Sequence, residues 1–63
     1  MAVGQKLKEL RTSNKLTQSE LAERIGTSQR SISQWELGGR DIKTSILIKV
    51  SELFDVSMDY FKE

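Results

Sequence analysis

Two glutamines and an arginine lie close together near the middle of the chain, at Gln29, Arg30 and Gln34. At about 100° of rotation per residue, a helix would carry them together with Ser33 on one arc of about 140°. The apolar residues Ile32 and Trp35 fall on the opposite side. Gln can pair with N6 and N7 of adenine through two hydrogen bonds, and Arg pairs similarly with O6 and N7 of guanine. The pattern predicts a helix face able to read base edges, although an ordinary solvated helix face has the same composition.

The residues before this face are typical of a short capped helix that ends in a tight turn. Thr17 and Glu20 have the spacing of a capping box, in which each side chain bonds a backbone amide near the other residue. A helix should therefore begin at Gln18 and run to about Ile25. Gly26 follows, where the left-handed conformation that ends many helices costs least.

The polar face itself belongs to the next expected helix. Thr27 or Ser28 can cap this helix, which runs to about Leu37 and is stopped by Gly38 and Gly39. Two short amphipathic helices joined at a glycine form a helix-turn-helix, whose second helix enters the major groove of DNA. Residues 28–37 are therefore predicted to be a recognition helix.

Three further helices should complete the fold. Apolar residues at helical spacing predict one from about Val3 to Ser13, and Ser57 can cap a short last one with Met58 and Phe61 facing inward. The stripe of the helix between them consists of Ile46, Leu47, Val50, Leu53 and Phe54. No alternating pattern indicates a strand. We therefore expect an all-α fold of five helices that forms a single domain over residues 1–63.

Contacts to the DNA backbone are expected around the helix-turn-helix. Gln18 begins a helix, where backbone amides and the positive end of the helix dipole favour a phosphate, although it could simply face solvent. The cap residues Thr17 and Ser28 should face the same backbone. Arg40 and Lys43 flank a loop that would lie beside the recognition helix, within reach of phosphates or a minor groove, although loop charges are often only solvated.

Charge and composition limit the classes of function. The net charge is only +1, but eight basic and five acidic residues lie up to Lys43, whereas two basic and four acidic residues follow. A surface charge this small can also arise by chance. The chain has no Cys and no His, so disulfides, a zinc finger and a thiol or Ser/His nucleophile are excluded. We expect no enzyme activity, cofactor, metal or small-molecule substrate.

The sequence also indicates where in the cell the protein is located. No run of apolar residues is long enough for a membrane span or a signal peptide, so a cytoplasmic, nucleoid-associated protein of a bacterium or a phage-infected host is expected.

Arg11 and Glu36 lie on different expected helices at inward or partly inward positions. They could form an ion pair between these helices, or remain two separate surface charges. Trp35 should be part of the core.

A surface for self-association is indicated near the C-terminal end. Tyr60, Met58 and Leu53 could leave an apolar patch suited to a two-fold contact, with Asp59 beside it. The same three apolar residues could instead complete a small core.

Nearly the whole chain, from about Val3 to Phe61, resembles the helix-turn-helix family of phage repressors and Cro proteins. The resemblance is carried by KLKELR, LTQSELAERIGTS, SISQWE and VSMDYF. It implies a lambda-repressor-like domain that binds two-fold operator DNA as a homodimer, pairing through the region around the final helices near Tyr60. Two departures are a missing proline in the loop of residues 38–44, and Asp55 at a position where glycine is common.

The same resemblance implies roles for particular residues. Gln18 would contact a phosphate, and Gln29, Arg30 and Gln34 would face base edges. Ser28 and Ser33 would lie nearby on the same surface. Arg11 and Glu36 resemble the family's interior ion pair.

Together these features predict a sequence-specific DNA-binding transcriptional regulator, in the form of a repressor that acts on a palindromic operator. The alternative is an antitoxin or adaptor module that works mainly through protein–protein contacts. A bare helical bundle is disfavoured because it would have little use for an arc of Gln and Arg.

Overall fold

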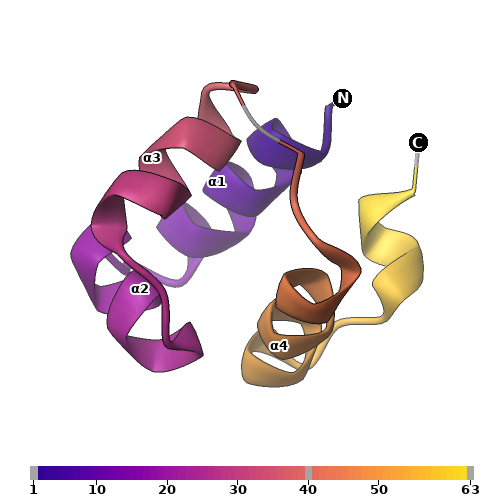
Figure 1. Cartoon of the computed structure of the whole chain (residues 1–63). Coiled ribbons are helices and arrows are strands. Elements are labelled where there is room, and N and C mark those ends of the chain that lie inside the picture. Colours follow the sequence, from indigo (N-terminus) through magenta and orange to yellow (C-terminus); the bar gives the residue numbers. More distant parts are fainter. Residues whose placement is uncertain (1, 40, 63) are drawn as a thin grey trace.

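The structure, a computed structural model, describes residues 2–39 and 41–62. These residues form four α-helices, one turn of 3₁₀ helix and no strand. The elements are α1 (Val3–Ser13), α2 (Gln18–Ile25), α3 (Gln29–Glu36), α4 (Thr44–Phe54) and the 3₁₀ helix Met58–Phe61. In Figure 1, α1, α2 and α3 form one group, and α4 lies beside it with the C-terminal turn. The all-helical class expected from the sequence is confirmed.

The expected fifth helix is a 3₁₀ turn rather than an α-helix. Ser57 caps it as predicted, since its Oγ accepts a hydrogen bond from the Asp59 amide at 3.1 Å. The Tyr60 amide donates to the Ser57 carbonyl at 3.0 Å, which is the three-residue spacing of a 3₁₀ helix. With only four residues, Met58–Phe61, the segment is too short to establish the ladder of an α-helix. Phe61 is buried as expected, and Met58 is half-buried.

The turn between α2 and α3 has the geometry that its residues dictate. The Thr17 hydroxyl accepts from the Glu20 amide at 3.0 Å, and the Glu20 carboxylate accepts from the Thr17 amide at 2.9 Å. Gly26 ends α2 in the left-handed conformation, with φ 73° and ψ 36°. Of the two expected caps for α3, the structure uses Ser28, whose Oγ accepts from the Ser31 amide at 3.1 Å. The two helices are thus held at a fixed angle by caps that the local sequence provides.

A single apolar core lies between the helices. Its fully buried side chains are Leu7, Leu21, Ile32 and Val50, and Trp35 is only 6% exposed, as expected. The first turn of α1 packs tightly on the end of α3. A Cβ atom added at Gly4 would lie 2.0 Å from the Trp35 carbonyl oxygen, which is well inside van der Waals contact. Only glycine permits this approach of the two helices.

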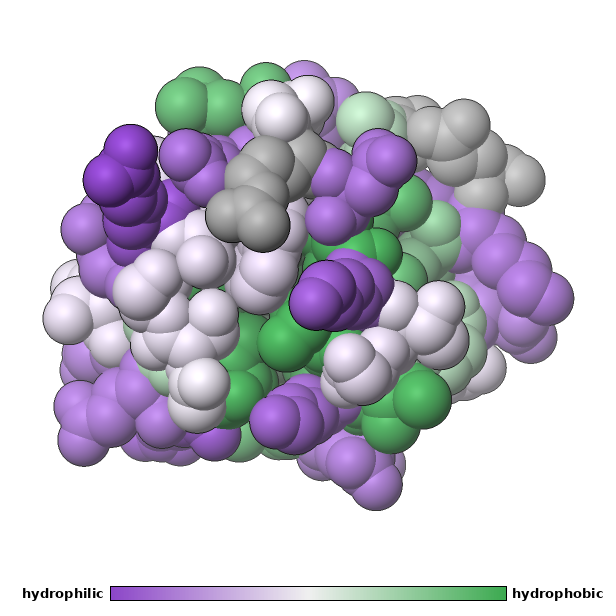
Figure 2. Space-filling view, in the orientation of Figure 1, coloured by the Kyte–Doolittle hydropathy of each residue, from purple (hydrophilic) through white to green (hydrophobic). Residues whose placement is uncertain are grey.

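The last α-helix, α4, begins without a side-chain cap and ends at a left-handed residue that is not glycine. Lys43 precedes α4 in an extended conformation and makes no side-chain cap. Asp55 follows α4 in the left-handed conformation, with φ 56° and ψ 48°, as anticipated for an Asp at a position where glycine is common. Seen from outside, the face in Figure 2 is mostly polar, with apolar side chains visible in its middle.

Candidate nucleic-acid interface

The outward face of α3 presents the polar side chains that the sequence singled out. Gln29 and Arg30 are exposed, and Ser33 and Gln34 are half-buried. On the opposite side of the same helix, Ile32 is completely buried. The helix therefore separates a polar face from the core, and the four polar side chains lie on one short element.

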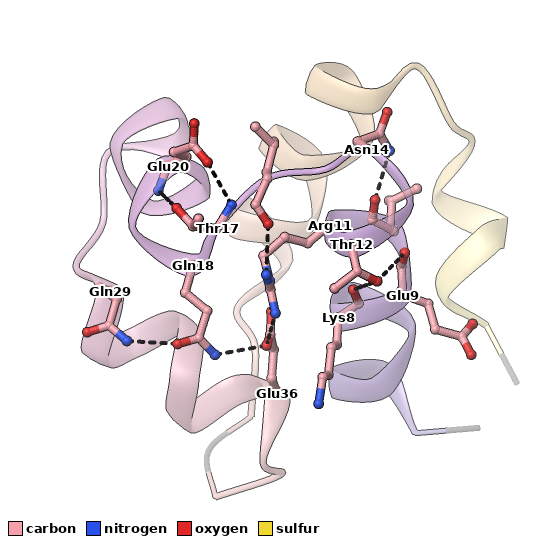
Figure 3. Close-up of polar contacts among 12 residues, drawn as sticks. Lys8, Glu9, Arg11, Thr12, Asn14, Thr17, Gln18, Glu20, Gln29 and Glu36 are labelled. Carbon is pink, nitrogen blue, oxygen red and sulfur yellow. Dashed lines mark hydrogen bonds and ion pairs between the residues drawn. The ribbon is translucent and has the colours of Figure 1, made fainter.

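A continuous chain of hydrogen bonds runs from the protein interior to this face (Figure 3). Arg11 and Glu36 form an ion pair between α1 and α3, with Nε to Oε2 at 2.7 Å and Nη2 to Oε1 at 3.0 Å. Gln18 Nε2 donates to Glu36 Oε1 at 2.9 Å. Gln29 Nε2 then donates to Gln18 Oε1 at 2.7 Å. The ion pair and the two glutamines, which sequence reasoning treated separately, form one network.

The interior end of this network is rigidly held. Only 10% of the Arg11 side chain and 3% of the Glu36 side chain are exposed. The third contact of the guanidinium is a hydrogen bond from Nη1 to the Leu16 carbonyl at 2.8 Å. Because a buried charge is tolerated only when it is paired and hydrogen-bonded, this arrangement restrains α1, α3 and the segment before α2 relative to one another.

The two cap residues expected to face DNA have structural tasks as well. Thr17 caps α2, and Ser28 both caps α3 and donates from its Oγ to the Ser31 Oγ at 3.0 Å. The Thr17 hydrogen bonds lower the pKa of the Glu20 carboxyl because they stabilise its ionised form. Both caps lie where the first amides of a helix point away from it, so a phosphate there would meet backbone donors.

The other predicted backbone contacts, Arg40 and Lys43, follow α3 in the sequence. Lys43 is exposed at the start of α4, whereas Arg40 lies outside the described residues. Between them and α3, Leu37 is 83% exposed. From the sequence Leu37 is expected only as a helix end, but its position eight residues after Gln29 places it within the angular range of the polar face. The sequence spacing alone would have predicted that Leu37 lies on the same side as the polar face.

The residues expected at a self-association contact lie on and near the 3₁₀ helix. Asp59 and Tyr60 are exposed and Met58 is half-buried. The Tyr60 hydroxyl donates to the Lys6 carbonyl at 3.4 Å, and Lys62 donates to Asp59 in an ion pair at 3.0 Å. Tyr60 is therefore tied to α1 while 36% of it faces solvent, and the nearby helix α4 exposes 44% of Ile48.

Comparison with known proteins shows which family and which relatives the chain is similar to. A family model described as helix-turn-helix, HTH_3, matches residues 7–61. The chain is 40% identical over 60 residues to the HTH-type transcriptional regulator ImmR of Bacillus subtilis, covering 95% of this chain and 47% of ImmR. It thus spans about half the length of that relative. None of the helices in the described part of the chain is long and apolar enough to cross a membrane.

Two solved structures have the same fold over nearly the whole chain. The P22 c2 repressor in complex with a synthetic operator superposes with a TM-score of 0.87 at 28% identity, covering 97% of this chain and 92% of the repressor chain. The restriction-modification controller protein C.AhdI from Aeromonas hydrophila superposes with a TM-score of 0.86 at 29% identity, covering 94% and 89%. Both likenesses include the helices that carry the polar network.

Proposed function

The chain belongs to the helix-turn-helix family, and on this premise we propose that it is a sequence-specific DNA-binding regulator of transcription that inserts α3 into the major groove. The observation that carries the proposal is the outward face of α3, with Gln29, Arg30, Ser33 and Gln34 on an element whose opposite side is anchored in the core. The amide group of Gln and the guanidinium group of Arg can each pair with a base edge through two hydrogen bonds.

Phosphate contacts would set the position of this face on the duplex. The start of α2, with Thr17 and Gln18, and the start of α3, with Ser28, offer backbone amides and the positive ends of two helix dipoles. Lys43 supplies a cation at the start of α4. Such contacts bind any DNA sequence, and the side chains of α3 then select among sequences.

We further propose that the protein acts as a homodimer on a palindromic operator, in the cytoplasm, and represses transcription by occupying the site. The similarity to the P22 c2 repressor, which was solved in complex with a synthetic operator, supports this role. Two copies related by a two-fold axis would place their α3 helices in major grooves about one helical turn apart. Met58, Asp59 and Tyr60 are the proposed residues of the dimer contact, because they lie together at one end of the molecule and are partly exposed.

The proposal is tested by selecting binding sites from a random duplex library and titrating the selected site against scrambled DNA at two salt concentrations. We expect a palindromic consensus that is bound at least about a thousandfold better than the scrambled duplex. Equal, strongly salt-dependent binding to both duplexes would leave only phosphate attraction and contradict sequence-specific recognition. Absence of binding to any duplex would instead favour the alternative function, an antitoxin or adaptor that binds another protein.

A further inference from the structure

We propose that Leu37 is a specificity-determining residue that reads the C5 methyl group of a thymine in the major groove. The inference rests on the proposed function, since it concerns what the α3 face recognises besides hydrogen-bonding groups. Among the residues that the structure describes, Leu37 is the most exposed large apolar side chain, at 83%, against 44% for Ile48 and 36% for Tyr60. The core therefore does not account for this leucine.

The first step is the direction of Leu37 around the axis of α3. A single exposed leucine is common on protein surfaces and indicates nothing by itself. Leu37 keeps a right-handed helical conformation, with φ −81° and ψ −9°, and its amide donates to the Ser33 carbonyl at 3.1 Å. At about 100° per residue it lies about 80° from Gln29, between the directions of Ser33 and Arg30. Whatever covers the polar face must therefore also lie over Leu37.

The second step is that the backbone holds Leu37 in this direction. After it, the Gly38 amide donates to the Trp35 carbonyl at 3.1 Å, and the Gly39 amide donates to the Gln34 carbonyl at 2.9 Å. These two bonds are those of a Schellman motif. In this motif the residue at the position of Gly39 often packs an apolar side chain back on the helix, but glycine has none. Leu37 is therefore presented on a fixed turn.

The third step concerns what an apolar side chain can contact in the major groove. The base edges there present hydrogen-bond donors and acceptors, and the one apolar group is the C5 methyl of thymine. A leucine placed over a polar edge would remove water from that edge without replacing its hydrogen bonds. Contact with the methyl instead removes apolar surface of both groups from water, which stabilises the complex. Leu37 therefore favours thymine over cytosine, which lacks this methyl.

The position of Leu37 along α3 predicts which base pair it reads. It follows Gln34 by three residues, an advance of about 4.5 Å along the helix axis. Successive base pairs are about 3.4 Å apart. For a helix that lies along the groove, the methyl should belong to a pair about one step beyond the pair read by Gln34, on the side away from the pair read by Gln29.

The experiment isolates the methyl group with the full chain and synthetic operator duplexes. The pair read by Gln34 is first identified as the one at which Gln34→Ala abolishes the preference. Each thymine of the selected operator is then replaced, one at a time, by deoxyuridine, which lacks only the C5 methyl and keeps every hydrogen-bonding group. At one thymine, beyond the pair read by Gln34, we expect the wild type to lose about fourfold in affinity, the effect of one buried methyl group.

Variants of Leu37 assign this loss to its side chain. Leu37→Ala and Leu37→Asn should bind the thymine and deoxyuridine duplexes equally, whereas Leu37→Met keeps an apolar side chain of similar volume and should retain the preference. Because the side chain is 83% exposed, these changes should leave the Tm nearly unaltered. The matched control Ile48→Ala removes an exposed apolar side chain from α4, and the preference for thymine over deoxyuridine should persist in it.

Cytosine methylation provides a second measurement at the same base pair. With C·G in place of T·A, a C5 methyl group added to the cytosine occupies the position of the thymine methyl. We expect this methylation to raise the affinity of the wild type about fourfold and to leave that of Leu37→Ala unchanged. Methylation that affects both proteins alike would contradict a contact with Leu37.

The inference would be overturned if Leu37→Ala kept the deoxyuridine penalty of the wild type, or if it lowered affinity equally for all duplexes, as loss of a contact with the DNA backbone would. Unchanged binding of Leu37→Ala to every duplex would also overturn it and favour a protein partner for this side chain. Failure of the selection to yield any consensus would contradict the proposed function itself. A consensus whose thymines all tolerate deoxyuridine would contradict only the role of Leu37.

Discussion

Arg30 is the exposed cation of the α3 face, next to Gln29 in the sequence. A guanidinium bound to O6 and N7 of guanine provides discrimination at one base pair. We expect Arg30→Ala to cost about 1–3 kcal/mol of binding free energy and to relax the preference at that pair alone. Titration against operators substituted one pair at a time measures this. A loss spread evenly over all pairs would show that Arg30 contacts only phosphate.

Lys43 should behave differently, because it lies outside α3 at the start of α4. A lysine that neutralises one phosphate contributes to affinity for every sequence and releases counterions on binding. We expect Lys43→Ala to weaken specific and scrambled DNA alike, and to reduce the slope of log K against log salt by about 1. The measurement is a salt titration of both duplexes with each protein. An unchanged slope would mean that Lys43 is only solvated.

Glu20 gives the fold a pH dependence. The hydrogen bonds from Thr17 lower the pKa of its carboxyl in the folded state, so the ionised group stabilises the fold above the ordinary Glu range, and this contribution is lost as the pH falls through the lowered pKa. We expect the difference in Tm between the wild type and Glu20→Ala to shrink as the pH is lowered from neutral into that acidic range. A Tm difference that is constant with pH would contradict the capping role of the charge.

At the scale of the elements, α1 and α3 depend on a glycine for their contact. A methyl group at Gly4 would meet the Trp35 carbonyl at 2.0 Å, and this oxygen belongs to the backbone of α3, so α1 would have to move. We expect Gly4→Ala to destabilise the fold by about 2 kcal/mol or more, as overpacking does in cores. The matched control is Gly26→Ala, where nothing lies within 4 Å of an added Cβ and only the φ of 73° is strained.

For this control we expect a cost of about 1–2 kcal/mol, the penalty of a left-handed L-residue. Urea denaturation of both variants measures the two free energies of unfolding. The packing explanation would be wrong if Gly4→Ala proved as stable as the wild type, because an alanine in the first turn of a helix otherwise improves helix propensity. Since α1 supplies Arg11 to the polar network, Gly4→Ala should also weaken operator binding.

At the scale of the whole molecule, the proposed dimer has a geometric consequence. Two α3 helices related by a two-fold axis match half-sites only when these lie on the same face of the duplex. We expect insertion of about five base pairs between the half-sites, half a helical turn, to abolish the gain in affinity of the full operator over a single half-site. Sedimentation of the complexes gives the number of bound chains. Equal affinity for both spacings would mean that two copies bind independently.

Much of the fold could be predicted because its signals are local. The bounds of α1 and α2, the capping box of Thr17 and Glu20, and the turn at Gly26 depend on residues within a few positions of one another. The amphipathic period likewise separates the polar face of α3 from its buried side. The last helix was the exception, since the cap at Ser57 predicts where a helix begins but does not show that it stops after four residues, too few for an α-helical ladder.

The sequence by itself determined which helices form and which side of α3 turns outward, because helix periodicity and capping act over less than two turns of chain. The tertiary structure alone decided that Gln18 lies between Glu36 and Gln29, which are 18 and 11 residues away from it. It also decided that Gly4 touches the backbone of Trp35. Such contacts depend on how the helices cross, and that angle is set by the combined packing of all their side chains.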